Sequence, residues 1–211
     1  MEKIVNKFIN NQALRHIWHF VRIPFAIILV LFVGLVIYRI PVVKERMKTE
    51  EVVEKIHSQK LTLEDVLGKH LPPEPDPALK DATIEGIDAN KNGIRDDVEL
   101  AIFKLHPDSA RIRAAELQYA MALQNELSNV FNSETLVAVL WEESRGYFCI
   151  DKVMPNVTDA AFNLTIKEIK KNVLNTEFRK SKREEIFSKY MVSRAIPSDQ
   201  FCDIDLNVLP N

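Results

Sequence analysis

Apolar residues recur three and four positions apart over most of the C-terminal half of this 211-residue chain, as in helices that bury one face. Four such stretches follow one another over short connections, and each begins after a residue that commonly caps a helix. These N-cap candidates are Ser109, Ser133, Thr158 and Thr176. No alternating strand pattern of comparable length accompanies them. The pattern predicts a mainly α fold in which residues 105–211 form a small helical bundle with a C-terminal tail.

The N-terminal region has a different pattern, because residues 23–38 carry no charge and are rich in Ile, Leu, Val and Phe. Sixteen helical residues span about 24 Å, slightly less than the roughly 30 Å of a bilayer's hydrocarbon core, and flanking apolar residues extend the run. We therefore predict a transmembrane anchor over residues 23–43. The alternatives are a cleaved signal peptide and a buried soluble helix. The 22-residue polar lead and the lack of a small-x-small cleavage pattern argue against a signal peptide.

Lysine and arginine flank the anchor on both sides, so the charge distribution does not fix its orientation. Two other features favour an inner (plasma) membrane protein with residues 1–22 cytoplasmic and the C-terminal domain periplasmic or extracellular. A long domain is translocated largely regardless of its charge, and a disulfide between Cys149 and Cys202 would suit an oxidising compartment. Closing that loop would stabilise the fold by roughly 4 kcal/mol. Free thiols in a cytoplasmic-facing adaptor are the alternative.

Two segments are predicted to connect the anchor to the folded domain. Residues 44–71 are predicted to be juxtamembrane stalk helices, the second of which has a Thr62–Asp65 capping-box pattern and a stop at Gly68. Four prolines between positions 72 and 77 then predict an extended linker over residues 72–86. We place the domain boundary in this linker.

Residues 88–99 place oxygen-bearing side chains at a spacing that suits calcium. Ca²⁺ takes six to eight oxygen ligands, which a twelve-residue loop supplies from positions 1, 3, 5, 7, 9 and 12. Gly93 stands at position 6, where the chain turns sharply. The candidate ligands are Asp88, Asn90, Asn92, the backbone carbonyl of Ile94, Asp96 and Glu99. We therefore predict one Ca²⁺ site within residues 87–104, which comprise a loop and its exiting helix.

This pattern resembles the EF-hand loop, D-x-[DN]-x-[DN]-G-x5-E, and is even more similar to the unpaired loops of secreted bacterial proteins and thrombospondin type 3 repeats. Position 8 holds Arg95 in place of the usual aliphatic residue, and the chain has no second loop, so the resemblance implies a solitary site. Three carboxylates and two amides imply a dissociation constant on the order of 10⁻⁴ to 10⁻³ M, as in extracellular modules. The alternative is a set of Asx turns around Gly93, with Asp96 capping the following helix.

The stretch "LVAVLWEESRGYF" superficially resembles the helix that carries the catalytic glutamate of lytic transglycosylases. The resemblance implies a periplasmic cell-wall hydrolase with Glu142 or Glu143 as general acid, which is the alternative function. The downstream Gly-Leu-Met-Gln segment of that family is missing, which favours a solvated acidic pair instead. The basic run at 179–185 is likewise predicted to be a solvated helix face, and the histidines show no metal-ligand spacing.

A formal charge of −2 gives no electrostatic reason to expect nucleic acid as a partner. The favoured function is therefore a single-pass membrane-anchored protein that binds calcium, with an extracytoplasmic helical domain in a structural or interaction role. No catalytic residue is assigned, and the sequence names no protein partner.

Overall fold

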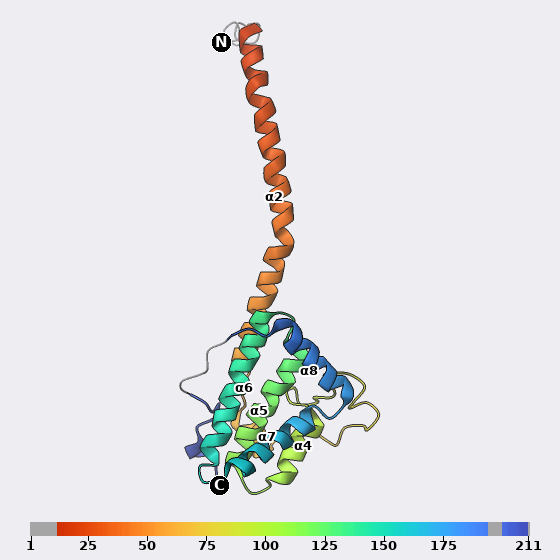
Figure 1. Ribbon diagram of the computed structural model, residues 1–211, viewed down its shortest axis with the longest axis vertical. Coiled ribbons are helices and arrows are strands. Elements are labelled where there is room, and N and C mark those ends of the chain that lie inside the picture. The colour runs from red at the N-terminus through yellow and green to blue at the C-terminus, as the bar shows by residue number, and fades with distance from the viewer. Residues whose placement is uncertain (1–11, 194–199, 211) are drawn as a thin grey trace. The chain divides into compact units, whose positions relative to one another are not determined.

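The computed structural model describes residues 12–193 and 200–210, and the regular elements in this part of the chain are all helices (Figure 1). The mainly α fold class predicted from the sequence is confirmed. The chain divides into two compact units, residues 1–48 and residues 49–211. Half of the predicted N-terminal cytoplasmic segment, residues 1–11, lies outside the described residues.

Helix α2, Gln12–Ser58, continues through Pro24 and Pro41, so the predicted anchor and the first predicted stalk helix form one helix. Its apolar side chains are exposed across the predicted anchor, as Val30 at 71 % and Phe32 at 61 % illustrate. Among the described residues, α2 is the one helix long and apolar enough to cross a membrane.

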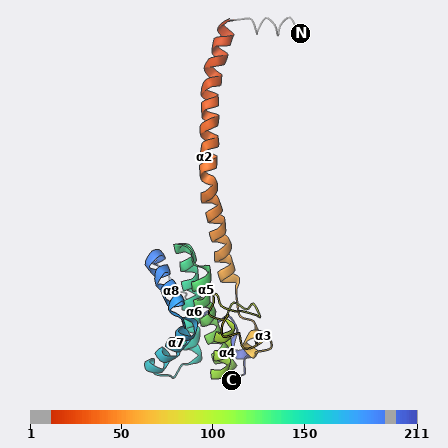
Figure 2. The same ribbon diagram turned by 90° about the vertical axis from the view of Figure 1, so that its right-hand side faces the viewer.

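The second unit is built around one central helix, against which the other helices pack. The elements of this unit are α3 (Leu63–Leu67), α4 (Asp96–Leu105), α5 (Ala110–Asn129), α6 (Ser133–Val153), α7 (Asp159–Val173), α8 (Glu177–Tyr190) and the short 3-10 helix η1 (Leu206–Val208). The central helix is α5, in which every residue from Arg113 to Leu127 is buried. In Figure 2, α7 and α8 lie on one side of α5, and α3 lies on the other.

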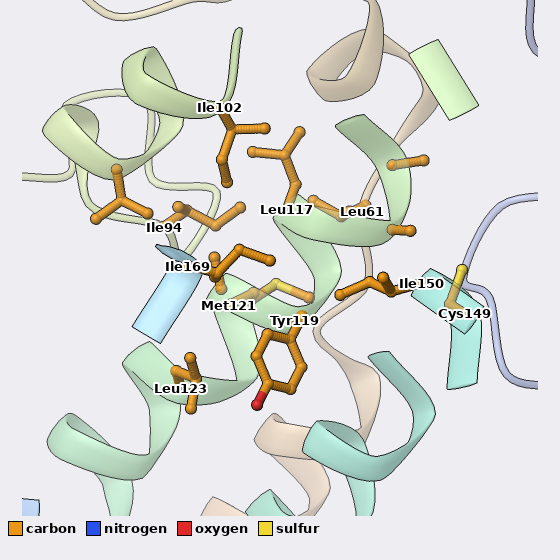
Figure 3. Close-up of a cluster of buried hydrophobic side chains, with 14 of the residues drawn as sticks. Leu61, Ile94, Ile102, Leu117, Tyr119, Met121, Leu123, Cys149, Ile150 and Ile169 are labelled. Carbon is orange, nitrogen blue, oxygen red and sulfur yellow. The ribbon is translucent and has the colours of Figure 1, made fainter. Parts of the chain in front are cut away.

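Two clusters of buried apolar side chains hold these helices together. The larger one joins α5 to α6, α7 and the region of α4, with Leu117, Ile150 and Ile169 among its members (Figure 3). The smaller one packs Ile56 of α2 against α6 and Ile186 of α8. Burial of this apolar surface is the main favourable contribution to the stability of the bundle.

The segment predicted as a stalk over residues 44–71 packs into the second unit from Thr49 onward. Ile56, Leu61 and Val66 are 1 %, 6 % and 0 % exposed, and they belong to the two core clusters. Val52 and Val53, which lie on the same helix face as Ile56, are partly buried against the smaller cluster, so this apolar stripe of α2 packs on the bundle. The compact units divide after Lys48, ahead of the proline-rich segment in which the sequence suggested a boundary.

Local capping chemistry sets most helix ends as predicted. Thr62 and Asp65 form the capping box of α3, and Ser109, Thr158 and Thr176 cap α5, α7 and α8. The prediction for α6 is wrong by one residue, because Asn132 is the cap and accepts a hydrogen bond from the backbone N–H of Thr135 at 2.9 Å. Asparagine and serine cap helices about equally well, so the sequence alone did not separate them.

The predicted disulfide is present, with an S–S distance of 2.05 Å between Cys149 on α6 and Cys202 in the C-terminal tail. It encloses the residues of α7 and α8 and fixes the tail to the bundle.

Candidate metal site

The first half of the predicted calcium loop is curled by side-chain oxygens that accept hydrogen bonds from later backbone N–H groups. Asp88 accepts from Gly93 at 2.9 Å and from Asn92 at 3.2 Å. Asn90 accepts from Asn92 at 3.3 Å, and Asn92 accepts from Ile94 at 2.8 Å. Gly93 has φ +87°, a left-handed conformation that glycine adopts without steric cost. The predicted ligands at positions 1, 3 and 5 are therefore held by the fold of the loop itself.

The second half of the loop returns to the first half through the start of α4. Asp96 accepts from the backbone N–H of Ala89 at 2.9 Å, and its own N–H donates to the carbonyl of Ile87 at 2.8 Å. Glu99 lies one turn further along α4 and accepts from the amide of Asn90 at 3.0 Å. The structure thus brings the side chains at positions 9 and 12 into contact with the loop that carries positions 1 to 5.

The hydrogen bonds of Asp96 differ from those expected of a helix cap. Arg95 occupies the N-cap position of α4, and its side chain makes no capping hydrogen bond. Asx turns are present, as expected both for a calcium loop and for the alternative of turns before a capped helix. They do not explain why Glu99 is turned inward to 1 % exposure.

Both carboxylates at the end of the loop are buried without a cationic partner. Asp96 and Glu99 are each 1 % exposed, and no lysine or arginine side chain in the described parts of the chain forms an ion pair with them. Burial raises the pKa of Glu99 to about 7 and also raises that of Asp96 above its ordinary range. Ionising these groups in the interior is costly unless a cation accompanies them.

The donor set is made of oxygen atoms alone, which suits a hard cation such as Ca²⁺ better than a transition metal. Within residues 12–193 and 200–210, no three His, Cys, Asp or Glu side chains are grouped closely enough to hold a metal. An ion bound here would therefore need the amide oxygens of Asn90 and Asn92 and the carbonyl of Ile94 in addition to carboxylate oxygens.

Arg95 connects the loop to the end of α7. Its buried guanidinium donates to the carbonyls of Asn172 at 2.8 Å and Val173 at 3.2 Å, and it pairs with Asp97. These carbonyls are among the last of α7, where they lack partners within the helix. Sequence reasoning treated Arg95 only as a departure from the EF-hand pattern, because nothing local reveals an acceptor 77 residues away.

Two further contacts link the loop to residues 59–70. Gln59 donates to the carbonyl of Asn92 at 3.4 Å and accepts from Asn125 of α5 at 3.1 Å. Asn90 donates to the carbonyl of His70, which follows α3, at 3.1 Å. The loop is therefore a junction between the segment after α2, the turn after α3, helix α5 and the end of α7.

Glu142 and Glu143 are not the solvated pair that the sequence suggested. Glu142 is 9 % exposed, and its carboxylate lies 2.7 Å from His57, 2.8 Å from Lys60 and 2.5 Å from Arg145. Burial alone would raise the pKa of Glu142, but these hydrogen bonds lower it below its usual value. A carboxylate that stays charged has no proton to donate, so this environment does not suit a general acid.

Glu143 accepts a hydrogen bond from the hydroxyl of Tyr119 at 3.0 Å and lies 3.4 Å from the ammonium of Lys170. Both glutamates thus have partners on other elements, which the pattern of α6 alone did not reveal.

The basic run at 179–185 also differs from its prediction as a solvated face. Arg179 is 0 % exposed and donates to the carboxylate of Asp81 at 2.5 Å and to three backbone carbonyls. Those carbonyls belong to Lys80, Thr83 and Ile84. Arg183 pairs with the buried Glu126 at 2.8 Å. The partners lie on elements distant in sequence, which is why the local charge pattern suggested solvation.

No protein-family model, no curated protein and no solved structure matches this chain.

Proposed function

We propose that this chain is a single-pass membrane protein whose helical domain lies outside the cytoplasm and is ordered by one Ca²⁺ ion in loop 88–99. The role of this domain is structural or in binding a partner. The apolar helix α2 supports the anchor, and the disulfide between Cys149 and Cys202 supports an oxidising compartment.

The observation that carries the calcium proposal is the burial of Asp96 and Glu99 with no lysine or arginine of the described segments paired to them, inside a loop that already holds Asp88, Asn90 and Asn92. A divalent cation removes the cost of ionising the two buried groups. It also binds the first half of the loop to α4 more firmly than one hydrogen bond between Asn90 and Glu99 does.

Calcium ordering of the loop has consequences beyond the loop. The loop is connected to α7 by Arg95, to α5 by Gln59 and to the turn after α3 by Asn90. An ordered loop would therefore hold these elements in defined relative positions. With a dissociation constant of 10⁻⁴ to 10⁻³ M, the site is empty at cytosolic calcium and filled outside. Calcium at ten times that constant would stabilise the folded state by about 1.4 kcal/mol.

Proteolysis of membrane vesicles tests both parts of the proposal. Lys91 is an exposed loop residue with φ +60°, so cleavage after it by a lysine-specific protease reports on the order of the loop. In right-side-out vesicles we expect calcium at ten times its dissociation constant to slow this cleavage about tenfold relative to a chelator. Asp88→Ala removes a ligand and should abolish the calcium effect. Glu85→Gln removes an exposed carboxylate outside the ligand set and should retain it.

The same experiment separates the possible failures. Equal cleavage rates with and without calcium in the wild-type chain would contradict calcium ordering. Protection in right-side-out vesicles that is lost only when they are lysed would place the domain in the cytoplasm and contradict the orientation.

A further inference from the structure

A polar pocket of about 780 Å³ lies away from the calcium loop, between the C-terminal tail and the bundle. Residues 200–207 of the tail form one wall. Four basic side chains surround it, namely Lys60 after α2, Arg111 at the start of α5, and Arg145 and Lys152 of α6. This volume is in the range of small-molecule sites, but the lining is polar where such sites are usually apolar.

The tail wall is fixed in place by four bonds. The disulfide holds Cys202, Arg145 donates to the carbonyl of Gln200 at 2.9 Å, and Gln118 donates to that of Phe201 at 2.7 Å. The amide oxygen of Gln118 also accepts from the backbone N–H of Asp203 at 2.9 Å. The pocket is therefore preformed, so a ligand loses little free energy in ordering it.

Two of the four basic side chains are neutralised within the protein. Lys60 lies 2.8 Å from Glu142 and 3.5 Å from Asp203, and Arg145 lies 2.5 Å and 2.9 Å from the same two carboxylates. These two cations and two anions form a balanced cluster beside the pocket. The carboxylate of Asp205, which also lines the pocket, accepts hydrogen bonds from the backbone and side-chain N–H groups of Asn207 in η1.

The other two basic side chains of the pocket are Arg111 and Lys152. The Nε–H of Arg111 is buried and makes no hydrogen bond, and neither side chain forms an ion pair with any acidic group in the described parts of the chain. The buried Nε–H is closed off from solvent and so does not face the pocket. Within the described residues, the pocket is therefore lined by two cationic side chains, Arg111 and Lys152, whose charge no carboxylate balances.

We propose that this pocket binds a small ligand bearing a phosphate or carboxylate group, with its oxygen atoms accepting hydrogen bonds from Arg111 and its charge opposed by Lys152. The guanidinium presents parallel N–H groups that match the oxygens of either group. The site is independent of the calcium loop, because it shares none of the proposed calcium ligands.

Line broadening of the ³¹P resonance of inorganic phosphate tests this proposal on the detergent-solubilised full chain in the absence of calcium. Weak binding to a large particle broadens the line in proportion to the bound fraction. We expect saturable broadening by the wild type and a dissociation constant at least about tenfold higher for Arg111→Gln. The matched control is Lys171→Gln, which removes an exposed lysine of α7 outside the pocket and should behave as wild type.

A parallel titration that follows the proton resonance of succinate distinguishes phosphate from carboxylate recognition, and binding of either supports the site. Equal broadening by wild type and Arg111→Gln, with both variants folded by circular dichroism, would overturn the proposal. Chloride at matched ionic strength is the second control. If it abolishes the broadening completely, the association is general and ionic, and the proposal is overturned.

Discussion

At the scale of single residues, the chain is notable for charged side chains buried along its central helix. Glu116 and Glu126 of α5 are 1 % and 0 % exposed, and Arg179 of α8 is 0 % exposed. Partners on other parts of the chain position these charges, such as Arg183 of α8 for Glu126 and Asp81, in the segment before α4, for Arg179. Removing one partner of such a pair leaves an uncompensated buried group.

Glu126 makes the stability of the bundle depend on pH. Burial raises the pKa of Glu126 to about 7, Arg183 of α8 and Lys170 of α7 oppose this rise, and Glu143 of α6 adds to it. In the unfolded chain the pKa is about 4.3, so between these values the folded state holds a proton that the unfolded state has lost. The contribution of protonated Glu126 to the free energy of unfolding is fully present below about pH 4.3 and is lost as the pH rises through 7.

We therefore expect the free energy of unfolding of the wild type to decrease between pH 5 and pH 8. In Glu126→Gln, which does not ionise, this decrease should be smaller by roughly 1 to 3 kcal/mol. Denaturant-induced unfolding at the two pH values measures this difference. Glu134→Gln, at an exposed position of α6, is the control and should follow the wild type. Identical pH dependence in wild type and Glu126→Gln would show that Glu126 does not titrate as argued.

At the scale of elements, the sequence predicted what local chemistry decides. The caps Thr62, Ser109, Thr158 and Thr176 act within three residues of their own position, so their patterns in the sequence were sufficient. The Asx turns of the loop are equally local. Packing of α8 on residues 80–84 was not predictable, because its main contact joins Arg179 to groups more than 90 residues away.

Arg179 should accordingly be essential for the attachment of α8. Arg179→Met keeps much of the volume but removes the ion pair with Asp81 and the donor to three backbone carbonyls. We expect the free energy of unfolding to fall by about 3 to 5 kcal/mol. Denaturant titration measures the loss, with Glu184→Gln at an exposed position of α8 as control. A loss below about 1 kcal/mol would mean that Arg179 adds little to the attachment.

At the scale of the whole molecule, the sequence predicted the apolar segment and the helical class because both follow from composition and periodicity along the chain. It did not predict that the end of α2 belongs to the folded unit. The same stripe of Val52, Val53 and Ile56 suits a free amphipathic helix and a helix packed on α6, and only the tertiary contacts distinguish them. The disulfide was predictable as a pairing because the chain has two cysteines.

The candidate calcium site was predictable as a set of positions, since a twelve-residue loop carries its ligands in sequence order. The sequence did not reveal the burial of Asp96 and Glu99 or the contacts through which Arg95, Gln59 and Asn90 join the loop to the bundle. Through those contacts, a bound calcium ion would have a structural consequence beyond its own ligands.

Calorimetric titration of the detergent-solubilised full chain with calcium tests the proposed calcium binding most directly. We predict saturable binding of one ion with a dissociation constant of about 10⁻⁴ to 10⁻³ M, lost in Asp88→Ala and Glu99→Gln and retained in Glu85→Gln. No binding up to about 10 mM calcium, or equal binding by Glu99→Gln and the wild type, would contradict it and leave residues 88–99 as a set of turns before α4.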